Sequence, residues 1–117
     1  MKRNKLGFFL REIRNENNDN LVEMAKKLNV TPSFISSVES GRRKLPESMA
    51  EQIEETYHLD HTQSEKLETL VMESSPILKI DMKDLSEKQR ELAVAFVKSV
   101  GNISETKINV FMNEMQA

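Results

Sequence analysis

The chain has 117 residues, of which 38% are hydrophobic and 31% charged, and it contains no cysteine. This length suits one compact domain with an appendage and excludes a large catalytic superstructure, while the missing cysteine excludes disulfides and thiolate zinc sites. No apolar run reaches the roughly 18 residues of a membrane span, and the N-terminus lacks the apolar core of a signal peptide. We therefore expect a cytoplasmic protein without membrane association.

The net charge of −2 is unevenly distributed along the chain. Residues 1–46 hold ten Lys/Arg and five Asp/Glu, a net charge of +5, whereas residues 47–117 hold seven and fourteen, a net charge of −7. A basic segment of this kind can face the phosphates of nucleic acid. The same asymmetry also arises by chance in helical proteins, so the motifs have to decide between the two interpretations.

Two helices are predicted at the start of the chain. Apolar residues recur at helical spacing over residues 5–16, which predicts the first helix. Asn20 and Glu23 have the spacing of a capping box, so the second helix should begin near Leu21. Asn29 stands where a left-handed C-cap is needed and should end that helix.

Three more helices are predicted to follow. Thr31 offers an N-cap and Pro32 suits a first helical turn, so the third helix should run from there to Ser40. Pro46 should open a fourth helix, and Thr62, with Glu65 three residues later, should cap a fifth. Five short helices are thus expected between residues 5 and 73.

The remainder of the chain is predicted to be a helical hairpin. Residues 77–81 are too short a run for their periodicity to choose between a strand and an extended linker. Ser86, with Gln89 three residues later, should cap a sixth helix, and Ser104 should cap a seventh. Both helices carry apolar faces that have to be buried against something.

The segment LVEMAKKLNVTPSFISSVESG meets the requirements of a helix-turn-helix. That motif needs a small residue where its helices cross, a left-handed turn residue, an apolar residue after it, and two apolar anchors in the second helix. These five positions are occupied by Ala25, Asn29, Val30, Ile35 and Val38. The alternative is an ordinary α-hairpin that matches by accident.

Over about residues 5–73 the sequence resembles the lambda-repressor-like helix-turn-helix regulators, also called the xenobiotic response element family. The best match is MAKKLNVTPSFISSVESGRRKLP, where Ser36, Gly41 and Pro46 fall at usual family positions. Asp19, at a turn position that is often apolar, and Asn29, in place of the common Gly, are departures. The resemblance implies an all-α fold with a five-helix DNA-binding domain at 1–75. The capping and periodicity of the remaining residues predict a helical tail at 76–117.

The start of the third helix should reach base edges, because an α-helix fits the major groove of DNA. The expected base-contacting residues are Thr31, Pro32, Ser33, Phe34, Ser36 and Ser37, with Ser33 and Ser37 favoured by the resemblance. The expected phosphate-contacting residues are Asn20, Thr31, Arg42, Arg43 and Lys44. A serine-rich face could instead serve solubility, which would leave specificity to DNA shape.

The resemblance also implies a structural ion pair. In similar repressors a glutamate at the position of Glu39 pairs with an arginine of the first helix, here assigned to Arg14. No cofactor, metal site or enzymatic activity is expected. His58 and His61 form an H-x-x-H pair without an evident third ligand, and no nucleophile stands with a base and an orienting acid.

The expected partners are double-stranded DNA and a second copy of the chain. Duplex DNA presents two-fold related half-sites, so a repressor should bind as a homodimer, and residues 77–115 are the candidate dimer surface. Packing of this hairpin onto the fourth and fifth helices is the alternative. A second functional hypothesis is an antitoxin or mobile-element switch protein, in which the acidic residues 47–117 hold a toxin or a metallopeptidase.

Overall fold

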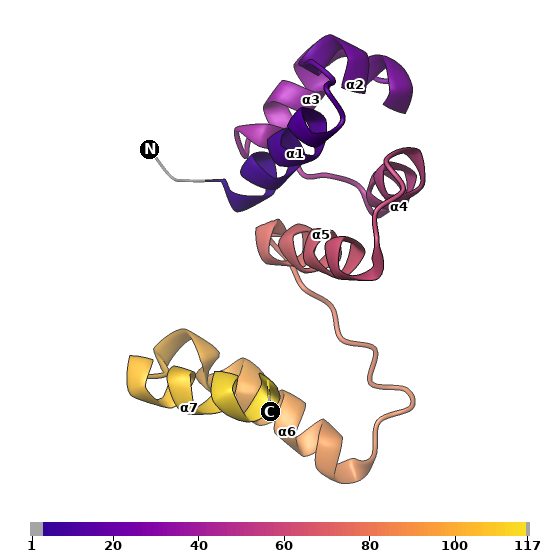
Figure 1. Ribbon diagram of the computed structural model, residues 1–117. Helices are drawn as coiled ribbons and strands as arrows, with labels where there is room; N and C mark the ends of the chain where they lie inside the picture. The colour runs from indigo at the N-terminus through magenta and orange to yellow at the C-terminus, as the bar shows by residue number, and fades with distance from the viewer. Residues whose placement is uncertain (1–3, 117) are drawn as a thin grey trace. The chain divides into compact units, whose positions relative to one another are not determined.

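The computed structural model describes residues 4–116, and every regular element in this range is helical (Figure 1). The first five helices are α1 (Lys5–Glu16), α2 (Leu21–Leu28), α3 (Pro32–Glu39), α4 (Glu47–Thr56) and α5 (His61–Ser74). They are followed by α6 (Glu87–Ser99), a 3-10 turn η1 (Val100–Asn102) and α7 (Glu105–Gln116). The all-α class is therefore confirmed. Lys2 and Arg3, which contribute to the basic N-terminal charge, lie outside the described residues.

The chain separates into two compact units, one ending at Leu78 and the other beginning at Lys79. We call residues 4–78 the head and residues 79–116 the tail. Residues 77–81, for which the sequence allowed either a strand or an extended linker, form neither strand nor helix. None of the helices within residues 4–116 combines the length and the apolar character that crossing a membrane requires.

Local capping signals place α2 and α3 where the sequence predicted them. The Asn20 side chain accepts a hydrogen bond from the Glu23 backbone N–H (2.8 Å), and the Glu23 carboxylate accepts one from the Asn20 N–H (3.0 Å). Asn29 is left-handed at φ +61° and ends α2. Thr31 caps α3 by accepting from the Phe34 N–H at 3.1 Å.

The predicted start of α5 was wrong by two residues. The capping box is formed by Asp60 and Gln63, which exchange hydrogen bonds of 2.8 and 3.1 Å, and not by Thr62 and Glu65. His58, in the left-handed region at φ +50°, turns the chain out of α4. The first capping residue after that turn begins the new helix, so Thr62 falls inside the first turn.

The head encloses a hydrophobic core to which all five of its helices contribute. Its most deeply buried side chains are Leu10, Ile13, Met24, Leu28, Ile35, Val38, Leu45, Ile53 and Leu67. In Figure 1, α1 and α3 lie side by side, and Gly7 of α1 lies against the backbone of Glu39. A methyl group on Gly7 would stand 2.8 Å from the Cα of Glu39, so only glycine permits this crossing.

The tail has well-formed helices but no core. Ser86 and Gln89 form the predicted capping box of α6, and the Ser104 hydroxyl accepts from the Lys107 N–H at the start of α7 (3.3 Å). No described residue of the tail is buried. The apolar faces that the sequence predicted are therefore exposed.

Candidate nucleic-acid interface

One side of α3 is exposed and is almost entirely composed of hydroxyl groups. Ser33, Ser36 and Ser40 are exposed and Ser37 is half-buried. The opposite side of the helix is inserted in the core through Ile35 and Val38. The helix therefore presents a polar, narrow face with no long side chain projecting from it.

Contacts from α2 and α4 fix the orientation of α3. Ala25 is buried on α2, which packs against α3. The turn between them closes with a hydrogen bond from the Val30 N–H to the Ala25 carbonyl (2.9 Å). The Gln52 amide of α4 donates to the Leu28 carbonyl (3.1 Å), which satisfies the end of α2.

The beginnings of α2 and α3 retain hydrogen-bond donors that can face a phosphate. The acceptor oxygens of Asn20 and Thr31 are used in capping, but the Asn20 amide N–H groups and the Thr31 hydroxyl proton remain available as donors. Pro32 has no backbone N–H, so the first backbone donor of α3 is that of Ser33. These groups stand at the positive ends of two helix dipoles.

The basic loop after α3 is attached to the same helix. The backbone N–H groups of Arg42 and Arg43 donate to the Ser37 carbonyl at 2.9 and 3.1 Å. The Arg43 guanidinium lies over the Phe34 ring, 5.1 Å from its centre. Phe34 is half-buried against the core, so its ring orients Arg43 as well as lying beside the exposed face. Arg42, Arg43 and Lys44 are all exposed.

An ion pair ties α3 to α1. The Glu39 carboxylate, 6% exposed, pairs with the Arg14 guanidinium, whose side chain is 13% exposed. Arg11 donates to the other carboxylate oxygen at 3.3 Å, although its side chain is 55% exposed. The Arg14 pair is the one that the family resemblance implied, and the second arginine was not anticipated. At the other end of the crossing, the Asn4 amide donates to the Val38 carbonyl (2.8 Å).

Residues 10–63 match the family model described as Helix-turn-helix. The head is a helix-turn-helix domain of the lambda-repressor-like type. This match supports a DNA-binding transcription regulator. No curated protein matches the chain, and no solved structure does.

The helix-turn-helix domain contains one polar network that sequence reasoning missed. The Asp19 carboxylate, in the turn before α2, accepts hydrogen bonds from Lys27 (2.6 Å) and from the Tyr57 hydroxyl (2.8 Å). The hydrogen bond from Lys27 and that from Tyr57 lower the pKa of Asp19. Burial, followed by the hydrogen bond to Asp19, raises the pKa of Tyr57. Because Lys27 is engaged here, it belongs to the fold and not to the DNA-facing donors.

The two histidines lie apart from this network. His61 is exposed on α5 and stands 3.7 Å from Glu65, and His58 occupies the left-handed turn after α4. Within residues 4–116, no three histidine or acidic side chains gather in a geometry that could hold a metal ion.

Proposed function

We propose that this protein is a transcriptional repressor that binds, as a homodimer, to operator DNA with two symmetrically related half-sites. The observation that carries the proposal is the exposed hydroxyl face of α3, flanked by two helix N-termini and by the basic loop 42–44. A helix with such a face fits the major groove, while donors on either side of it can hold phosphates. Occupancy of an operator that overlaps a promoter then excludes RNA polymerase.

Base recognition is assigned to the first two turns of α3. The contacting residues are Thr31, Pro32, Ser33, Phe34, Ser36 and Ser37, with Ser33 and Ser37 first among them. A serine hydroxyl can donate to or accept from any base edge, so each contact discriminates weakly. Pro32 and the edge of the Phe34 ring add apolar contact with a thymine methyl. We therefore expect moderate sequence specificity, to which DNA shape contributes.

Phosphate binding is assigned to residues on both sides of α3. These residues are Asn20, Thr31, Arg42, Arg43 and Lys44. Each cation that neutralises a phosphate releases counterions, so the logarithm of the binding constant should fall by about 0.9 per log unit of salt for each contact. The three basic residues should therefore dominate the salt dependence of binding.

Selection of bound fragments from random duplexes, followed by anisotropy titrations over a salt series, tests the proposal. Lys44→Ala should weaken binding to all sequences and reduce the salt slope by about 1. Ser33→Ala should instead change the preference at one base position. Lys83→Ala, an exposed lysine of the tail, is the matched control and should leave the slope unchanged. Failure to select a sequence, or a slope near zero, would contradict the proposal.

The second candidate function is binding of a toxin or metallopeptidase partner, and the exposed apolar faces of the tail favour it. The charge distribution weakens the form of this hypothesis that relied on an acidic tail. Residues 47–78 contain one Lys/Arg and eight Asp/Glu, whereas residues 79–117 contain six of each. The acidic excess therefore belongs to α4 and α5, and the tail has no net charge to attract a basic partner.

A further inference from the structure

Exposed apolar side chains are concentrated in the tail. Of sixteen exposed large hydrophobic residues in the described part of the chain, ten lie between Leu92 and Met115. They are Leu92, Val94, Phe96, Val97, Val100, Ile108, Val110, Phe111, Met112 and Met115. Isolated exposed hydrophobic residues need no explanation, but a concentration of this kind marks an interaction surface.

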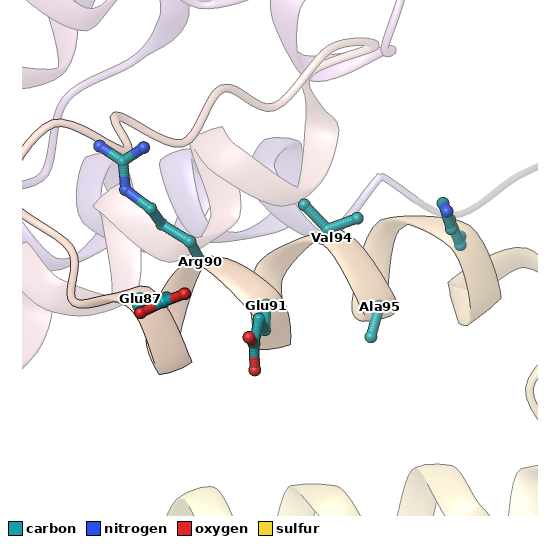
Figure 2. Close-up of a pocket in the computed structure, with 6 residues that line it drawn as sticks. Glu87, Arg90, Glu91, Val94 and Ala95 are labelled. Carbon is teal, nitrogen blue, oxygen red and sulfur yellow. The ribbon is translucent and has the colours of Figure 1, made fainter.

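Most of these side chains share one face of each helix. At 100° per residue, Leu92 and Phe96 lie roughly 40° apart on one side of α6, and Val97 lies roughly 100° further round the helix. Val100 follows in η1. The opposite face carries charge: Figure 2 shows residues that line a pocket there, which are Glu87, Arg90, Glu91, Val94, Ala95 and Lys98. In α7, the residues Ile108, Phe111, Met112 and Met115 form the corresponding apolar arc. Each helix is therefore amphipathic with its apolar side uncovered.

We propose that a second copy of this chain covers these faces, so that the α6 and α7 helices of two chains form a four-helix bundle. This inference rests on the proposed function, because it identifies the surface through which the proposed homodimer forms. Four amphipathic helices that share a central apolar core are a stable arrangement, whereas a single pair without buried residues is not.

The charge of the tail favours a second copy over a different protein. Residues 79–117 carry six basic and six acidic residues, so two tails meet without net repulsion. A partner recognised by charge complementarity would require a net charge on this unit, and there is none. A copy of the same chain is also available at equal concentration whenever the protein is made.

The size of the surface is sufficient for a specific dimer. Val94 and Val110 lie off the apolar faces, which leaves eight of these side chains on each chain. Burying their exposed halves on both chains would remove roughly 1,000 Å² of apolar surface. Specific interfaces begin at about this area, before any polar rim is counted.

The linker is long enough for a tail-mediated dimer to place both heads on DNA. Residues 75–86 lie outside the regular helices and join α5 to α6. An extended chain covers up to about 3.3 Å per residue, so each linker can span roughly 40 Å. Half-sites one helical turn apart are separated by about 34 to 36 Å, which two such linkers can accommodate.

Sedimentation equilibrium of the full chain without DNA tests the inference, using charged substitutions on opposite faces of the same helix. Phe96 (48% exposed) and Val94 (46%) are matched in exposure but lie roughly 160° apart around α6. In α7 the corresponding pair, also two residues apart, is Met112 (50%) and Val110 (57%). We expect Phe96→Asp and Met112→Asp to weaken dimerisation at least a hundredfold. Val94→Asp and Val110→Asp should change it less than threefold.

The wild-type protein should sediment at twice the 13.5 kDa chain mass. A wild-type monomer at tens of micromolar would overturn the inference. The apolar faces of α6 and α7 would then be covered by another protein or by the head. A dimer equally sensitive to all four substitutions, or to none, would also overturn it. DNA binding is measured separately. A tail-dependent dimer that selects no DNA contradicts the proposed function alone. A chain that is monomeric without DNA but binds a selected duplex with two half-sites as a dimer contradicts the inference alone.

Discussion

The head and the tail are built from helices with equally good caps, but they differ in what those helices bury. Capping boxes start α2 and α5 in the head and α6 in the tail, each with a pair of reciprocal hydrogen bonds. The head then closes around a core of seventeen buried hydrophobic residues, while no described residue of the tail is buried. Capping and periodicity therefore determine where helices form, and burial determines whether they hold tertiary structure alone.

This difference corresponds to a division of labour in the proposed repressor. A helix that reads base edges has to be held rigidly, and the core, the Glu39 ion pair and the Gly7 crossing hold α3 in the head. A surface that joins two chains has to remain uncovered in each of them. The folding of the tail should therefore depend on association, whereas the folding of the head should not.

The largest expected effect is on the head. Glu39→Ala removes the carboxylate that pairs with Arg14 and leaves a largely buried guanidinium without its partner. Breaking a buried ion pair in this way costs about 3 to 5 kcal/mol, so the free energy of unfolding of the head should fall by that amount. Urea denaturation followed by circular dichroism measures it.

Arg11→Ala is the matched control, because Arg11 contacts the same carboxylate from a side chain that is 55% exposed. Its loss should cost about 1 kcal/mol or less. If both variants unfold at the wild-type urea concentration, the ion pair does not hold α1 against α3.

The second effect contrasts a glycine of each unit. Gly7→Ala places a methyl group 2.8 Å from the Cα of Glu39, so the two helices have to separate. We expect a loss of about 1 to 3 kcal/mol in the free energy of unfolding of the head. Gly101→Ala meets no atom within 4 Å and should change stability by less than about 0.5 kcal/mol. Equal effects at the two positions would contradict the close crossing.

The ends of the helices show which structural features could be predicted from the sequence. Signals that act within one turn were readable, which is why Asn20, Asn29 and Thr31 gave the ends of α2 and α3. The start of α5 was misplaced because Asp60 and Thr62 both have the sequence spacing of a capping box, and the turn at His58 decides between them. Competing local signals need the preceding turn to separate them.

Contacts between distant residues could not be read from local patterns. Asp19 looked like a departure from an apolar turn position, yet Tyr57, thirty-eight residues away, donates a hydrogen bond to it. Glu39 was placed beside Arg14 through the family resemblance, because no local rule joins α3 to α1. The exposed serines of α3 followed from helical periodicity, but the position of Arg43 over Phe34 did not.

The third effect is a response to dilution that only the tail should show. If the tail folds by dimerising, the dissociated fraction rises with the inverse square root of concentration, so exchange of the α6 and α7 amides should accelerate about threefold per tenfold dilution. Hydrogen exchange at two concentrations, read by mass spectrometry, measures this. Amides of α1 and α3 serve as the internal control and should not respond. If the exchange rate of the tail amides does not depend on protein concentration, the tail does not fold by dimerising.

The smallest expected effect is the pH dependence that the Asp19 network gives the head. The lowered pKa of Asp19 stabilises the fold above its unfolded value of 3.8, and this stabilisation is lost as the pH falls further. The raised pKa of Tyr57 acts at the other extreme, because above pH 10.0 the unfolded chain loses a proton that the fold retains. The free energies of unfolding of wild type and Asp19→Asn should therefore converge in acid, and those of wild type and Tyr57→Phe in alkali. If these differences in the free energy of unfolding, measured by urea titration, stay constant in both acid and alkali, the protonation of the network is not linked to folding.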